Sequence, residues 1–115
     1  MIQQRMRTVW QNAKKRASSK QTLFDIDLAH VLMLYDQQEG LCALSGVKLS
    51  LETPQGHALQ RSPSLDQVVP GAGYTKGNVQ LVTTQANLSK STLSQAEYVN
   101  LCEQVYFHQR RGNLG

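Results

Sequence analysis

The sequence predicts a single α+β domain, and three observations carry this prediction. Apolar residues recur at helical spacing near both ends of the chain, whereas two extended segments in its middle flank a turn rich in glycine. With 115 residues, the chain can bury one modest hydrophobic core without a second domain. Because hydrophobic residues make up 40% of the chain and aromatic residues only 6%, we expect a globular fold with a thin core.

The first predicted helix covers about residues 2–18 and belongs to a basic N-terminal segment, 1–20. Its apolar residues repeat at helical spacing and are Ile2, Met6, Val9, Trp10, Ala13 and Ala17. The segment holds no acid, and its basic residues are Arg5, Arg7, Lys14, Lys15, Arg16 and Lys20. This charge run favours a polyanion as partner, and a solvated helix face is the plainer alternative.

A short extended piece is expected over residues 23–26, followed by a second helix over about 28–39. Asp27 is a suitable N-cap for that helix, and Gly40 is a suitable stop. We read His30, which lies within the helix, as a structural or surface histidine.

The middle of the chain predicts strands rather than helices. Residues 41–51 suggest a short strand or tight turn, and the loop after it contains His57. Residues 62–69 should be extended, the glycines and proline of 70–73 require a turn, and a second strand is expected at about 78–82.

A short helix is expected over about 84–91, and a longer one over about 95–110. Ser94 and Glu97 form a capping box that opens the longer helix, whereas the chain from Gly112 onward should fray. The apolar stripe of this last helix consists of Tyr98, Leu101, Cys102, Val105 and Tyr106.

Four stretches of the chain form one joint pattern: Leu41–Gly46, Ser64–Asp66, Gly73–Val82, and Asn87 with Lys90. This pattern resembles small phage and prophage HNH endonucleases of the His-Me finger class, and the similarity reaches back to residues 15–17 and 24–25. The resemblance implies a ββα-metal core over 62–91, made of a β-hairpin and a helix, with flanking α-helices that include a C-terminal one at 94–110. It also implies a DNA endonuclease or nickase that hydrolyses phosphodiesters with a metal ion.

The resemblance assigns roles to three residues. Asp66 and Asn87 would hold a divalent cation, Mg²⁺ or Mn²⁺, and Asn78 would support the turn between the strands. One carboxylate and one amide oxygen suit Mg²⁺, which prefers oxygen ligands and keeps several waters. Such a cation stabilises the charge that builds on the phosphate while a nearby base takes a proton from the attacking water.

The sequence departs from this family at two places. Many HNH domains carry two Cys-x-x-Cys pairs that bind a structural zinc, and the corresponding residues here are Cys42, Ser45, Thr83 and Ala86. No structural zinc is therefore expected, and Cys42 reads as a small buried apolar side chain.

The second departure is Gln67, which stands where the general-base histidine usually follows the acid. An amide cannot accept a proton at neutral pH, and losing a general base costs about 10² to 10⁴-fold in rate. Gln67 can still position the attacking water. The candidates for a substitute base are His57, Tyr74 and His108, and none has a strong claim.

Several basic residues are candidates for DNA contacts. Lys90 lies one turn beyond Asn87, Lys76 lies on the turn, and Arg61 precedes the first strand of the motif. The N-terminal candidates are Arg5, Lys14, Lys15 and Arg16. Plain surface charge is the alternative for each lysine, and Arg61 could equally meet a neighbouring acid.

Two other functions stay open. The first is a degenerate HNH module that binds DNA without cutting it, and the second is a small phage effector that binds a host protein. The two unpaired cysteines and the lack of a long apolar run predict a cytoplasmic protein with no membrane partner, which acts in the bacterial host of a phage or prophage.

Overall fold

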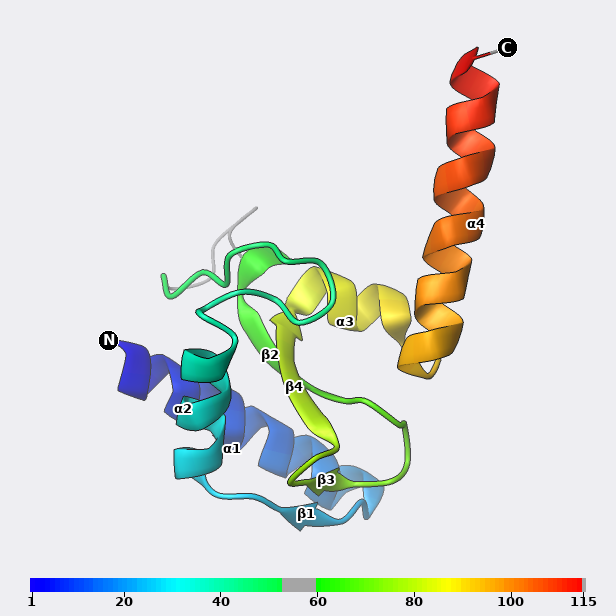
Figure 1. Ribbon diagram of the computed structural model, residues 1–115. Coiled ribbons are helices and arrows are strands. Elements are labelled where there is room, and N and C mark those ends of the chain that lie inside the picture. The colour runs from blue at the N-terminus through cyan, green and yellow to red at the C-terminus, as the bar shows by residue number, and fades with distance from the viewer. Residues whose placement is uncertain (53–59, 115) are drawn as a thin grey trace.

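A computed structural model describes residues 1–52 and 60–114 of the chain. Four helices and four short strands occur in these residues (Figure 1). In chain order they are α1 (Ile2–Lys20), β1 (Phe24–Asp25), α2 (Leu28–Gln37), β2 (Pro63–Gln67), β3 (Tyr74–Thr75), β4 (Val79–Thr83), α3 (Thr84–Lys90) and α4 (Gln95–Leu114). The chain is thus α+β, as the sequence predicts.

An antiparallel hairpin of β2 and β4 lies at the centre of the fold. Leu65 pairs with Leu81, and Asp66 pairs with Gln80. The two members of a pair project from one face, and consecutive pairs project from opposite faces of the hairpin. The Leu65 and Leu81 side chains are buried and belong to the hydrophobic core. The other face carries Ser64, Asp66 and Gln80.

Helices α1 and α2 cover the apolar side of the hairpin (Figure 1). The buried residues of α1 are Met6, Val9, Ala13 and Ala17, which follow the predicted helical spacing. Helix α1 ends at Lys20 because Gln21 adopts a left-handed conformation, with a φ of 53°, and closes the last turn. The helix therefore includes Ser18 and Ser19 and runs two residues beyond its predicted end at about residue 18.

The second helix starts at the predicted cap, since the Asp27 carboxylate accepts a hydrogen bond from the backbone N–H of His30. Just beyond its end, the side chain of Gln38 donates to the carbonyl of Leu81 and accepts from its N–H. This amide bonds the free edge of β4 much as a neighbouring strand would.

Strand β3 was not predicted from the sequence, which indicated only a turn at this point. Tyr74 and Thr75 pair in parallel with Phe24 and Asp25 of β1. The rings of Phe24 and Tyr74 pack with their centroids 5.6 Å apart. Residues that are distant in the sequence thus create this small sheet.

Helix α4 projects from the rest of the molecule (Figure 1). The capping box is present, because Ser94 N–H donates to the Glu97 carboxylate and Glu97 N–H donates to the Ser94 hydroxyl. The helix continues to Leu114, four residues beyond its predicted end at about 110. None of the helices in the described part of the chain is long and apolar enough to span a membrane.

Candidate functional site

Helix α3 lies across the polar face of the hairpin and brings distant side chains together. Ser64 and Asp66 are two residues apart on β2, while Asn87 and Lys90 are three apart on α3, so each pair shares one face of its element. The Asn87 amide donates to the Ser64 hydroxyl at 2.8 Å, and the Lys90 ammonium lies 3.3 Å from the Asp66 carboxylate. Thr83 caps the start of α3 by accepting from the N–H of Ala86.

The Asp66 carboxylate is buried, and each of its oxygens accepts one hydrogen bond. Its Oδ1 accepts from the ammonium of Lys90, and its Oδ2 accepts from the side-chain amide of Gln80 at 3.0 Å. Lys90 also donates to the backbone carbonyl of Gln67 at 3.0 Å. The side chains of Lys90 and Asp66 are 0% and 5% exposed, so the two charges are desolvated together.

This geometry corrects one prediction about Lys90. The sequence placed its ammonium on the protein surface, facing DNA, whereas the structure buries it against Asp66. The correction has a simple cause: Lys90 occupies the helix face that packs on β2, and a buried carboxylate needs a partner charge.

Asp66, Gln67 and Asn87 line one cleft of about 410 Å³. Basic residues of α1 line the same cleft, namely Arg16 and Lys20. Arg16 also donates to the carbonyl of Leu65 at 3.1 Å, which ties the C-terminal half of α1 to β2. The predicted metal ligands and part of the basic helix therefore meet at a single concave surface.

Gln67 braces the connection between the strands. Its Oε1 accepts a hydrogen bond from the backbone N–H of Gly73 at 2.9 Å. Because that backbone group can only donate, the oxygen of the amide is committed to it, and Nε2 is the end left for other partners. Gln67 can thus donate to a phosphate oxygen or a water through Nε2, while its oxygen already accepts one hydrogen bond.

Asn78 occupies the turn-supporting position that the resemblance assigns to it. Its Oδ1 accepts from Val69 N–H at 2.9 Å, and its Nδ2 donates to the carbonyls of Val69 and Gly73 at 3.2 and 2.7 Å. Gln67 and Asn78 therefore hold both backbone groups of Gly73. At this position, whose φ is 103°, a Cβ would lie 3.0 Å from Leu23, so glycine is required.

The positions that the resemblance equates with zinc ligands lie side by side. The Cys42 sulfur accepts from the N–H groups of Ser45 and Thr83, and Ala86 N–H bonds the Thr83 hydroxyl. Burial raises the pKa of the Cys42 thiol, but the hydrogen bonds from Ser45 and Thr83 outweigh it and the net pKa is lowered. Cys42 therefore joins the turn after α2 to β4 as a hydrogen-bond acceptor.

The remaining N-terminal candidates are dispersed. Arg5 donates to the carbonyls of Leu51 and Glu52, and the Lys14 ammonium lies 5.0 Å from the centre of the Trp10 ring. Lys15 is exposed and is not among the residues that line the cleft. Only Arg16 of the four candidates reaches the cleft.

Two further basic candidates lie outside the cleft. Arg61 is exposed ahead of β2, and Lys76 is exposed on the turn after β3, where it lines a separate hollow with Trp10 and Lys14. Their place on the surface is compatible with contacts to a polyanion that extends beyond the cleft.

The candidate bases are not equally placed. Tyr74 lines the cleft but is only 6% exposed and packs on Phe24. His108 is exposed on α4, and it does not line the cleft. His57 lies outside the described residues.

The donor chemistry of the cleft suits Mg²⁺ or Mn²⁺, because Asp66 offers a carboxylate and Asn87 an amide oxygen. Within residues 1–52 and 60–114, no cluster of three or more His, Cys, Asp or Glu side chains could hold a metal ion. A cation at Asp66 would need water and substrate phosphate as further ligands, and it would compete with the Lys90 ammonium.

Sequence reasoning missed Gln80 and undervalued Lys20 as site residues. Gln80 becomes a neighbour of Asp66 only through the register of the hairpin. The spacing could have indicated Lys20, because it lies four residues after Arg16 and therefore on the same face of α1.

Comparison of the chain with models of protein families, with curated proteins and with solved structures finds no match.

Proposed function

We propose that this protein is an HNH-type, metal-dependent DNA endonuclease or nickase whose active site is the cleft at Asp66. One observation carries the proposal. Asp66 on β2 and Asn87 on α3 are 21 residues apart in the sequence, yet they line one cleft together with Arg16 and Lys20. A carboxylate, an amide and two cations at one concave surface suit a phosphodiester and a divalent cation.

The order of the elements supports the ββα-metal core. An antiparallel hairpin leads directly into α3, and the acid and the amide stand on the first strand and the helix. The hydrogen-bonded group of Cys42, Ser45, Thr83 and Ala86 gives independent support, because two distant segments meet where related domains would bind zinc.

Each residue of the cleft has a defined part in this proposal. Arg16 and Lys20 attract the phosphate backbone, and the free amide nitrogen of Gln67 donates to a phosphate oxygen or to the attacking water. Asp66 and Asn87 would hold Mg²⁺ or Mn²⁺, which would supply charge stabilisation at the phosphate and the leaving oxygen. Lys90 holds the buried Asp66 side chain in place through their ion pair.

A second candidate function is DNA binding without cleavage. It is favoured by the Lys90–Asp66 ion pair, which occupies the acid, and by Gln67, whose oxygen is committed to Gly73. The basic cleft would still bind a phosphate backbone in that case.

A plasmid assay tests the proposal. The purified chain is incubated with supercoiled plasmid in Mg²⁺, in Mn²⁺ and in EDTA, and nicked circles are expected only with a metal ion. Asn87→Ala removes one proposed ligand without leaving a buried charge unpaired, and it should abolish nicking while thermal unfolding stays cooperative. Lys48→Ala, an exposed lysine that does not line the cleft, serves as the control that keeps full activity.

Gel shifts separate the two candidates. DNA binding in EDTA that weakens steeply with salt, combined with no nicking in either metal, favours the binding module. Negligible DNA affinity at physiological salt would overturn both functions and return attention to a protein partner.

A further inference from the structure

The outer part of α4 carries exposed apolar residues that the described parts of the chain, 1–52 and 60–114, leave uncovered. Every residue from 99 to 112 is exposed. The exposed fractions of Val105, Tyr106 and Phe107 are 53%, 54% and 58%, and Leu101 and Val99 are also exposed. Isolated helices are marginal in water, and contiguous exposed apolar residues mark an interaction surface. This helix therefore needs a partner to be covered.

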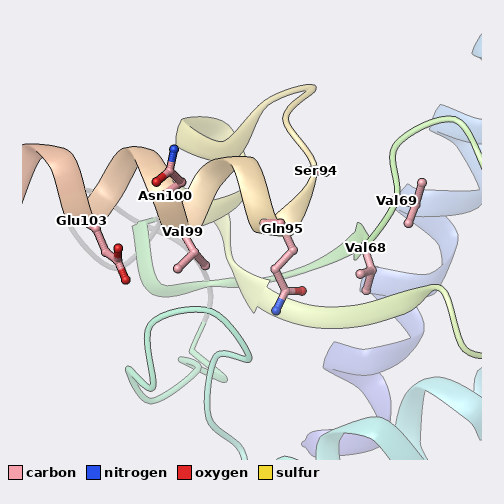
Figure 2. Close-up of a pocket in the computed structure, with 8 residues that line it drawn as sticks. Val68, Val69, Ser94, Gln95, Val99, Asn100 and Glu103 are labelled. Carbon is pink, nitrogen blue, oxygen red and sulfur yellow. The ribbon is translucent and has the colours of Figure 1, made fainter.

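A groove between α4 and the body extends the same surface. One hollow of about 660 Å³ lies between Val68 and Val69 after β2 and the first turns of α4. Gln95, Val99 and Glu103 point into it from the helix, as Figure 2 shows. A second hollow of about 290 Å³ continues along α4 past Leu44 and shares Val99 and Glu103 with the first. The groove thus has Val68 and Val69 on the body side, and Val99 between the polar Gln95 and Glu103 on the α4 side.

The charges on α4 indicate what covers it. Glu97 and Glu103 lie in its N-terminal half, and Arg110 and Arg111 lie in its C-terminal half. Glu103 and Arg110 are seven residues, about two turns, apart and border the apolar stripe on the same edge. An antiparallel second copy of α4 would place each Glu103 beside the other copy's Arg110, and it would also pair the helix dipoles favourably.

We infer that the chain forms a homodimer through antiparallel packing of α4 against α4 of a second copy. The interface is self-complementary, so one twofold axis covers both apolar surfaces and forms the Glu103 to Arg110 contact twice. With Glu103 beside Arg110, the two helices overlap from about residue 99 to their C-terminal ends, which is about 24 Å or slightly more than four turns. This inference concerns assembly and does not depend on the proposed nuclease activity.

Sedimentation equilibrium of the full chain and its variants tests the inference. The natural chain should be a dimer at about 100 μM, where a contact with a Kd of ~1 μM is nearly saturated. Val105→Asp should raise the Kd at least 100-fold, because it places two charges in the apolar interface, while far-UV circular dichroism confirms that the body stays folded.

Charge reversal tests the orientation. Glu103→Arg and Arg110→Glu should each raise the Kd about tenfold, because like charges then face each other twice, and the double variant should return to within about threefold of the natural chain. If either residue only stabilised the fold, the double variant would not recover the dimer Kd. Recovery therefore indicates direct contact between residues 103 and 110 of the two copies.

Three results would overturn the inference. A natural chain that stays monomeric at about 100 μM excludes a second copy as the occupant. A double charge variant that associates no better than the single variants excludes the antiparallel contact. A Cys102–Cys102 disulfide that forms rapidly on mild oxidation also contradicts it, because an antiparallel pair with Glu103 beside Arg110 places Cys102 opposite position 111 and keeps the two exposed thiols apart.

Discussion

At the scale of single residues, the distinctive feature of the site is a buried ion pair where a cation would be expected to bind. Lys90 and Asp66 are both withdrawn from water, and each has one further hydrogen bond, to the carbonyl of Gln67 and from the amide of Gln80 respectively. Burying two charges is costly, and it is tolerated only when they are paired and hydrogen-bonded. The pair therefore locks α3 to β2 and controls access to the carboxylate.

Lys90→Met is expected to lower the free energy of unfolding by about 3–5 kcal/mol, because it leaves the Asp66 carboxylate buried without a partner. Asp66→Asn combined with Lys90→Met should be less destabilised, since the buried charge is gone and Gln80 keeps its acceptor. Urea denaturation measures both effects. Lys76→Met, at an exposed lysine, should change the stability by less than about 0.5 kcal/mol.

A divalent cation should partly replace the lost ammonium in Lys90→Met. If Asp66 is a metal ligand, Mn²⁺ will raise the unfolding midpoint of Lys90→Met more than that of the natural chain. Equal responses of the two proteins to Mn²⁺ would count against Asp66 as a ligand.

Gln67→His is expected to increase the rate of plasmid nicking by about 10² to 10⁴-fold, because it restores a proton acceptor beside the acid. The change also removes the acceptor of Gly73 N–H, and the free energy of unfolding should fall by about 1 kcal/mol. Gln67→Leu, the matched control, should lose the same stability and gain no activity. A histidine variant as slow as the leucine variant would show that the missing base is not what limits cleavage.

At the scale of elements, hydrogen bonds between side chain and backbone decide where helices and turns form. Asn78 and Gln67 hold the connection between β2 and β3 through Gly73, and Asp27 and Thr83 cap α2 and α3. Such local bonds explain why the boundaries of these elements lie close to the predicted ones.

The capping box makes the stability of α4 depend on pH. Hydrogen bonds from the backbone and the side chain of Ser94 lower the pKa of Glu97. A pKa below the unfolded-state value, about 4.3, means that the stabilisation is complete above that pH and is lost as the pH falls through the folded-state pKa.

The helical circular dichroism signal should therefore decrease between about pH 4.3 and the lower pKa of the capped Glu97. Glu97→Gln should show a flatter titration, and Ser94→Ala should flatten it in the same way, because it removes one of the two bonds. Coincident titration curves for the natural chain and Glu97→Gln would contradict a role of this carboxylate in α4.

At the scale of the whole molecule, the chain consists of a packed body and a projecting helix. Its radius of gyration is 15.0 Å, against about 13 Å for a compact chain of this length, and its longest dimension is 50 Å. The body holds the hydrophobic core and the cleft, whereas α4 carries exposed apolar residues away from both. The proposed DNA-binding cleft and the proposed dimer surface therefore lie on separate parts of the molecule.

The cleft should bind DNA through its charge. Lys20→Ala is expected to weaken binding to all DNA sequences alike, and to reduce the slope of log affinity against log salt by about one. Fluorescence anisotropy at several salt concentrations in EDTA measures both quantities. Lys48→Ala, also an exposed lysine, should leave the slope unchanged, and an equal loss in both variants would mean that net charge, not the cleft, attracts DNA.

Much of the fold could be predicted from the sequence because its determinants are local. Helical spacing predicted α1, the capping residues predicted the starts of α2 and α4, and the glycines after Pro70 predicted the turn between the strands. The convergence of Asp66 and Asn87 followed from a resemblance in motif, and the two residues do line one cleft. Strand β3 was missed, because its pairing with β1 joins segments about 50 residues apart.

The sequence by itself thus determined the order of the four helices and of the two hairpin strands, and the pair of residues around which the cleft forms. Only the tertiary structure decided that Lys90 and Gln80 bond the Asp66 carboxylate, that the oxygen of Gln67 accepts from Gly73, and that the described residues leave α4 uncovered. Helix periodicity and caps act over a few neighbouring residues, whereas the burial of a charge or of an apolar face depends on which distant side chains are packed against it.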